Sequence, residues 1–190
     1  MNRASSASSS VADMQREMRF SYLGGAPGML VSASVWLIAS LVNLNHSAPA
    51  SVWALFIGGA LIHPISVLLT RAVGRSGRHS KGNPMGTLAM GSTIWMIYCL
   101  PLVYAISLWR MDLFFPAMMM VIGGRFLVFA TIYGAAVYRV CGAVLALAAY
   151  GIAASHLPAY AGGFAGSAIE GLFALIIYFR SRSEPAPSRS

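Results

Sequence analysis

The chain has 190 residues, of which 57% are hydrophobic and only 9% are charged, and its formal net charge is +8. Because soluble domains carry about 25% charged residues, this composition excludes an ordinary soluble domain, and the length leaves room for one compact domain. The sequence therefore predicts an all-α polytopic membrane protein surrounded by the lipid bilayer.

Six apolar stretches are each long enough to cross a bilayer as a helix. They cover residues 23–44, 51–70, 85–108, 113–137, 140–157 and 161–179. All connections are short except residues 71–84, and short connections predict antiparallel hairpins. Residues 21–180 therefore form one six-helix transmembrane domain. The polar, Ser-rich start lacks an apolar signal-peptide region, so the first span is expected to remain in the membrane.

The two tails flank this domain. Residues 1–20 are expected to form a cytoplasmic N-terminal tail, and residues 181–190 a cytoplasmic C-terminal tail. Within the first tail, residues 11–20 place Val11, Met14 and Met18 on one helical face, which favours an interfacial helix on the membrane surface. A frayed tail is the alternative interpretation for so short a segment.

The distribution of basic residues predicts the orientation. All but two of the 13 lysines and arginines fall in the tails and in the connections after the second and fourth spans, and the two exceptions are Arg110 and Arg125. Such residues accumulate on the cytoplasmic side of membrane proteins, so both termini are expected in the cytoplasm. The cations are scattered over tails and turns and do not form one basic face, which argues against nucleic acid as a partner.

The long connection, residues 71–84, carries Arg75, Arg78, His79 and Lys81 among flexible glycines. These side chains could bind a phosphate or an anionic lipid headgroup. The simpler interpretation is that the charges only orient the protein in the membrane.

Three residues that can carry a charge, His63, Arg125 and Glu170, lie deep within the spans, and they are the candidate substrate or ion site. Arg125 and Glu170 sit near the middle of the fourth and sixth spans, and His63 precedes Pro64 in the second. A charge at a helix centre costs about 2.5–3.5 kcal/mol on insertion scales, so such residues usually face a protein interior and serve a function. Because all three spans run in the same direction, we expect the three side chains to meet in a central polar cluster.

Small residues recur at every fourth position in two spans. Gly24 and Gly28 do so in the first, and Gly162 and Gly166 lead to Glu170 in the sixth. Ridges of this kind let helix backbones approach closely in a membrane. We therefore predict helix packing at these glycines, with Glu170 on the tightly packed face.

Several motifs together resemble an uncharacterised family of small bacterial six-span membrane proteins. They are Tyr-Leu-Gly-Gly-Ala-Pro-Gly at 22–28, Gly-Gly-Ala-Leu-Ile-His-Pro at 58–64, the Gly- and Arg-rich run at 74–84, Phe-Pro-Ala at 115–117 and Ile-Gly-Gly-Arg at 122–125. The resemblance implies a location in the bacterial inner membrane. It implies no activity, ligand or catalytic residue.

Three classes of function remain open. Transport or binding of a small solute would use the intramembrane polar site, with Arg125 attracting an anion and Glu170 or His63 carrying a proton. A non-catalytic partner or regulatory protein would dock another helix on the glycine ridge and hold lipid at the basic loop. An intramembrane enzyme is less well supported, because the chain lacks a His-Glu-x-x-His helix or a second paired acid. No cofactor or metal is expected; the lipid bilayer is the expected partner, and a homo-oligomer is a further candidate.

Overall fold

The computed structural model describes residues 10–184, and in this range the chain is helical, with no strand. The outermost parts of the two predicted tails, with Arg3 and Arg189, lie outside the described residues. The helices are α1 (Val11–Tyr22), α2 (Ala26–Asn45), α3 (Ala48–Ala72), α4 (Pro84–Trp109), α5 (Phe114–Tyr133), α6 (Val137–Ala154) and α7 (Ala159–Ser181), with short 3-10 turns at Leu23–Gly25 and Met111–Leu113.

The six segments from α2 to α7 are long and apolar enough to cross a membrane. Large apolar side chains also cover the outside of the bundle, where Leu102, Leu147 and Leu172 are more than half exposed. A water-soluble monomer rarely exposes so much apolar surface, whereas lipid accommodates it without cost. The chain is therefore an all-α, multi-pass integral membrane protein, as the composition predicts.

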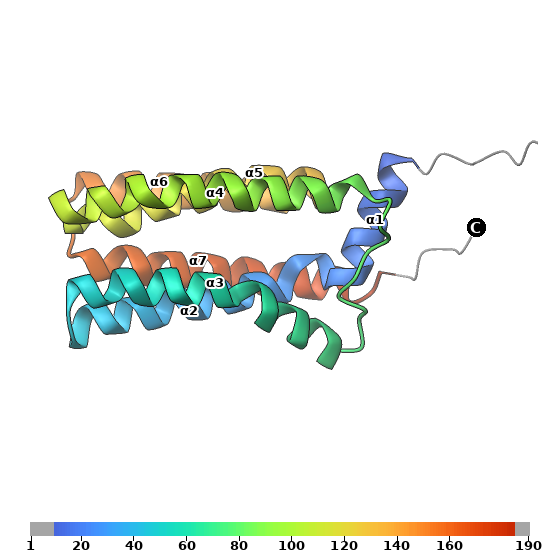
Figure 1. The fold of residues 1–190 in the computed structure, drawn as a ribbon, viewed down its shortest axis with the longest axis horizontal. Helices are drawn as coiled ribbons and strands as arrows, with labels where there is room; N and C mark the ends of the chain where they lie inside the picture. The colour runs from blue at the N-terminus through green and yellow to red at the C-terminus, as the bar shows by residue number, and fades with distance from the viewer. Residues whose placement is uncertain (1–9, 185–190) are drawn as a thin grey trace, which may run out of the picture.

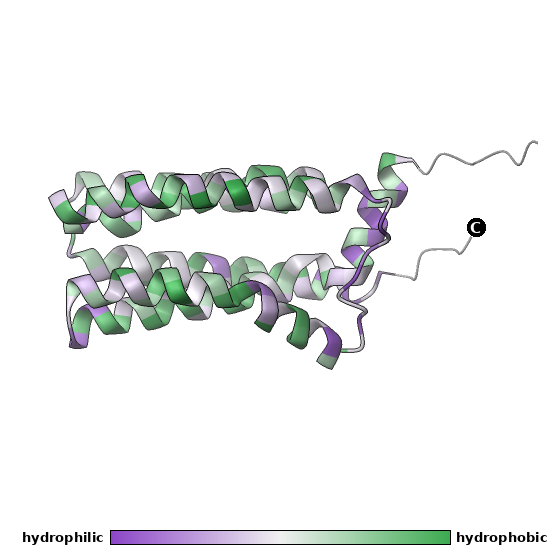
Figure 2. Cartoon of the chain, viewed as in Figure 1, coloured by the Kyte–Doolittle hydropathy of each residue, from purple (hydrophilic) through white to green (hydrophobic). Residues whose placement is uncertain are grey.

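The bundle has two layers (Figure 1). Helices α2, α3 and α7 form one layer, and α4, α5 and α6 form the other. The closest packing joins α2 to both α3 and α7 in the first layer and α5 to α6 in the second. At one end of the bundle lie α1, the α3–α4 loop (residues 73–83) and the end of α7; we call it the terminal end. Hydrophilic residues gather there, over α1 and the loop (Figure 2).

A sharp turn separates α1 from α2. Ser10 caps α1 in a reciprocal capping box with Asp13. The helix stops because Leu23, Gly24 and Gly25 all have positive φ, at 51°, 63° and 86°. Glycine adopts this left-handed conformation without steric cost, so the double glycine directs α1 across the terminal end, while α2 enters the bundle. A helix thus forms over the segment predicted as interfacial, and its position on a membrane surface stays a prediction.

The boundary between the fourth and fifth spans differs from the prediction. Helix α5 ends at Tyr133, four residues before the predicted end of the fourth span, because Gly134 adopts the left-handed conformation at φ 59°. Helix α6 begins at Val137, so Arg139 lies in its first turn and not in a connection. The continuous apolar run from 113 to 137 hid this break.

Glycines bring the helices of each layer together. Where α5 crosses α6, a Cβ added to Gly123 would lie 2.9 Å from the Gly142 carbonyl oxygen, and one added to Gly142 would lie 2.6 Å from that of Gly123. Any side chain at either position would separate the two backbones. The aromatic rings of Phe114 and Phe115, both fully buried, fill the core at the start of α5.

Candidate functional site

Glu170 is fully buried in the middle of α7. One carboxylate oxygen, Oε1, accepts a hydrogen bond of 3.0 Å from the indole Nε1 of Trp36 in α2. The other, Oε2, is buried and makes no hydrogen bond with the described residues. Buried polar atoms are almost always paired, so an unpaired carboxylate oxygen inside a transmembrane bundle marks a strained or functional position.

Gly166 creates the space for this contact. It lies one helical turn before Glu170, and a Cβ added there would come within 3.0 Å of the Trp36 ring. The bare backbone of Gly166 therefore lets the indole lie flat on α7 with its N–H beside the carboxylate. The ring of Phe115, 6.0 Å away between centroids, closes the other side of Trp36.

Arg125 has a different set of neighbours, all of them neutral. Its terminal nitrogens donate to the Thr93 hydroxyl at 2.9 Å and to the Met96 sulfur at 3.3 Å, both in α4. The guanidinium also lies 4.9 Å from the centroid of the Phe129 ring. Its Nε atom is buried without a hydrogen-bond partner among the described residues. The guanidinium is thus partly desolvated and makes no salt bridge within residues 10–184.

The three residues of the predicted central cluster make no direct contact with one another. No hydrogen bond or salt bridge within residues 10–184 joins any two of His63, Arg125 and Glu170. Glu170 faces α2, Arg125 faces α4, and His63 is exposed on the outside of α3. The depth of a residue can be counted along a span, whereas the rotation of each helix about its own axis depends on packing, and this rotation separates the three side chains.

The basic loop also divides its side chains among different contacts. Arg75 lies over the Phe20 ring at 4.1 Å, and His79 shares a 2.8 Å hydrogen bond with the Tyr22 hydroxyl. Both contacts hold the loop against the end of α1. Arg78 and Lys81 are exposed and free of such contacts in the described chain. The four residues therefore do not converge on one site in this structure.

The four predicted packing glycines have unequal roles. Added Cβ atoms at Gly162 and Gly166 would meet Phe115 at 2.7 Å and Trp36 at 3.0 Å, so both lie at tight helix crossings. Gly28 has only an ordinary contact with Ser66 at 3.6 Å. Gly24 lies in the turn before α2 and so does not continue a helical ridge, but it does pack closely, because a Cβ added there would meet Ser181 and Ile177 of α7.

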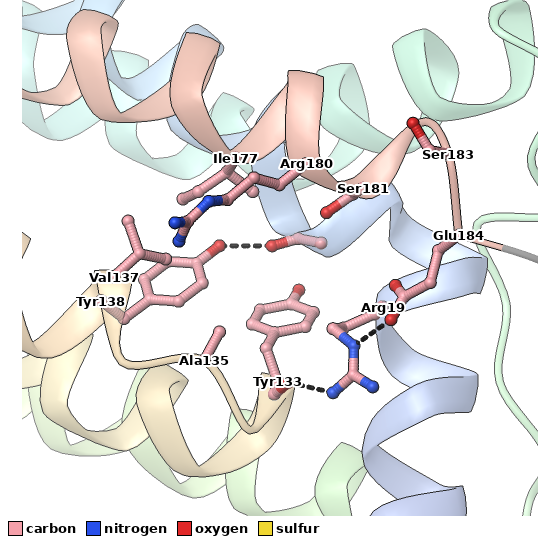
Figure 3. A pocket seen from close by; sticks show the side chains of 11 residues that line it. Arg19, Tyr133, Ala135, Val137, Tyr138, Ile177, Arg180, Ser181, Ser183 and Glu184 are labelled. Carbon is pink, nitrogen blue, oxygen red and sulfur yellow. Dashed lines mark hydrogen bonds and ion pairs between the residues drawn. The ribbon is translucent and has the colours of Figure 1, made fainter.

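A pocket of about 370 Å³ at the terminal end was not predicted (Figure 3). We call it the terminal pocket. It is lined by Arg19, Gly24, Tyr133, Ala135, Val137, Tyr138, Ile177, Arg180, Ser181, Ser183 and Glu184. The sequence signals for it are the Gly24-Gly25 pair and the two tyrosines on either side of Gly134. For the two arginines of this pocket, Arg19 and Arg180, the sequence predicts a role only in membrane orientation.

Three contacts build the terminal pocket. Arg19 in α1 donates to the Tyr133 carbonyl oxygen and to Glu184 Oε1, each at 2.6 Å. The Tyr138 hydroxyl donates to the Gly24 carbonyl oxygen (Figure 3). These contacts join α1, the α5–α6 turn and the end of α7. Within residues 10–184, no three His, Cys, Asp or Glu side chains lie close enough together to hold a metal ion.

Comparison with known proteins agrees with the family resemblance predicted from the motifs. No curated protein and no solved structure matches the chain. The model of a family of unknown function, DUF7010, matches residues 11–180, from the start of α1 to the last turn of α7. The chain therefore belongs to the DUF7010 family.

Proposed function

We propose that the protein binds a small anionic solute within the membrane and carries it across. The observation that supports this proposal is that Arg125 and Glu170, opposite charges in transmembrane helices, form no direct ion pair within residues 10–184. Each is held by neutral partners and keeps one buried polar atom unpaired. A purely structural role would be served better by a direct ion pair or by apolar side chains, since a lone buried charge is costly.

The two residues are proposed to have separate roles. Arg125 supplies positive charge for the solute, since its direct contacts are with a neutral hydroxyl, a sulfur and an aromatic ring. A carboxylate or phosphate group arriving at the guanidinium would remove the cost of the lone charge. Glu170 serves as a proton carrier, because a carboxyl group sealed between α2 and α7 can change its charge only by taking up or releasing a proton.

A binding screen tests the role of Arg125. The purified full chain in mild detergent would be heated with acetate, succinate, lactate or phosphate, each matched in ionic strength with chloride. We expect at least one anion to raise the melting temperature of the wild-type protein, and Arg125→Gln to reduce this effect. Arg139→Gln is the matched control, because Arg139 is exposed at the first turn of α6. The same response in the Arg125 variant, or no response of the wild type to the whole panel, would contradict the proposal.

We also propose that the protein lies in the inner membrane of a bacterium, with its terminal end facing the cytoplasm. The basic residues gathered at that end support this orientation. The exposed Arg78 and Lys81 would add attraction to anionic lipid headgroups, worth about 1 kcal/mol per cation near the surface. An epitope fused to the C-terminus should be protected from protease in intact spheroplasts; digestion from outside would contradict this orientation.

A further inference from the structure

We propose that the terminal pocket is a second anion site, distinct from Arg125, which takes a small carboxylate or phosphate group between Arg19 and Arg180. We further infer that Glu184 competes with that anion for Arg19. This inference goes beyond the proposed transport function, because it rests on a different set of residues at the end of the bundle.

The charges of the terminal pocket favour an anion. Two guanidinium groups and one carboxylate line it, so the balance is positive with Glu184 in place. Arg19 is oriented by the Tyr133 carbonyl oxygen, which fixes the direction in which its remaining N–H groups point. A guanidinium held in this way is the usual partner of carboxylate and phosphate groups. Arg180 makes no hydrogen bond or salt bridge within residues 10–184, and Figure 3 shows it extending toward Tyr138.

Glu184 already shows that the position beside Arg19 accepts a carboxylate. Its Oε1 lies 2.6 Å from the Arg19 Nε, and both side chains are less than a quarter exposed. Its Oε2, however, is buried without a hydrogen bond in the described chain. The tethered carboxylate therefore uses only one of its two oxygens, and a free anion that could also reach Arg180 would make more hydrogen bonds.

Hydroxyl groups and apolar walls set the size and chemistry of the ligand. The Tyr133 hydroxyl points into the terminal pocket, and Ser181 lies on its wall (Figure 3). Val137 and Ile177 supply apolar surface for a short carbon skeleton. A volume of about 370 Å³ lies near the lower end of the range for small-molecule sites. The pocket thus fits a small organic acid, a phosphate ester or the phosphate group of a lipid.

The binding test uses the full chain in detergent. We would measure the dissociation constants of inorganic phosphate and succinate by calorimetry, at constant ionic strength. We expect Arg180→Ala to weaken binding roughly fivefold, as for a partly screened charge contact. Arg182→Ala is the matched control: it removes the same charge at the same end, but its guanidinium lies over Phe179, outside the pocket. Equal weakening by both variants, or no measurable binding, would overturn the proposal.

Glu184→Gln tests the competition. Because this variant keeps the shape and removes the negative charge, we expect phosphate to bind roughly fivefold more tightly. Unchanged or weaker binding would overturn the role given to Glu184. Nanodiscs of phosphatidylcholine alone, or with phosphatidylglycerol, then identify the source of the anion. A lipid headgroup is the ligand if phosphatidylglycerol blocks phosphate binding, and a free anion is the ligand if it does not. Because Arg125 is proposed to bind the same anions, these titrations are made in the Arg125→Gln background, so that the two proposals can fail separately.

Discussion

The hydrogen bond between Trp36 and Glu170 provides the sharpest test of the α2–α7 interface. Trp36→Phe keeps an aromatic ring on Gly166 but removes the indole N–H. Glu170→Leu removes the acceptor and keeps a side chain of similar size. Combining the two substitutions in a double-mutant cycle isolates the contact from the packing changes that each one causes alone.

The expected magnitude follows from the geometry. The bond is 3.0 Å long, and both partners are at most 2% exposed. Interhelical hydrogen bonds in membrane proteins contribute about 0.6 kcal/mol on average and up to about 1.7 kcal/mol. We expect a coupling energy of about 1 kcal/mol. A value above about 2 kcal/mol would indicate an ionised carboxylate, because bonds to charged groups contribute about 1.5–3 kcal/mol.

Reversible unfolding of the purified protein in mixed micelles, with increasing dodecyl sulfate, would give the four free energies of unfolding. Ala149→Gly, at a buried site on α6 away from this interface, is a control for general loss of stability. A coupling energy within error of zero, with each single variant destabilised by its own amount, would refute the hydrogen bond as a stabilising contact.

Three further predictions concern the terminal end. Gly25→Ala should lower the free energy of unfolding by about 2 kcal/mol or more, because φ is 86° and the new Cβ would press on Tyr138. The control is Gly151→Ala, in an open helical position, which should be neutral or stabilising by up to about 1 kcal/mol. Tyr138→Phe should cost about 1–3 kcal/mol by leaving the buried Gly24 carbonyl without its donor, and equal stability in the same micelle titration would contradict the contact. Burial alone would raise the pKa of Glu17. The hydrogen bonds from the α3–α4 loop together have the larger effect, so the pKa lies below its ordinary value of 4.5. The contribution of Glu17 to the stability of the loop is therefore complete above that pH and is lost as the pH falls through the lowered pKa. The backbone amides of the loop should then exchange hydrogen faster in acid. Glu17→Gln should abolish this pH dependence.

The sequence was sufficient to predict the six-span fold because the bilayer imposes a strong length and polarity requirement on each helix. Local backbone geometry was harder to predict. Gly134 ends α5 inside an apolar run, and nothing in the hydropathy of residues 113–137 marks it. Gly24 is predicted as part of a packing ridge, whereas its positive φ angle, together with that of Gly25, makes it part of the turn that sets α1 across the bundle.

The candidate site could be predicted only in part. Arg125 and Glu170 were found because charges are rare in spans. Their partners could not be found, since a difference in helix rotation decides whether α7 presents Glu170 to α2 or to α5. The terminal pocket depends on two contacts of Arg19, one with Tyr133 and one with Glu184. In the chain, Tyr133 lies more than 100 residues from Arg19, and Glu184 lies more than 160 residues from it. No local pattern could have brought them together.

The most direct test of the central claim is solute-driven proton movement in proteoliposomes that contain a pH-sensitive dye. An inward gradient of the anion that binds at Arg125 should acidify or alkalinise the lumen of wild-type vesicles. The lumen pH of vesicles with Glu170→Gln should change little or not at all, although the variant inserts and folds to the same extent. Equal proton movement in wild-type and Glu170→Gln vesicles would contradict the claim that α7 carries the proton.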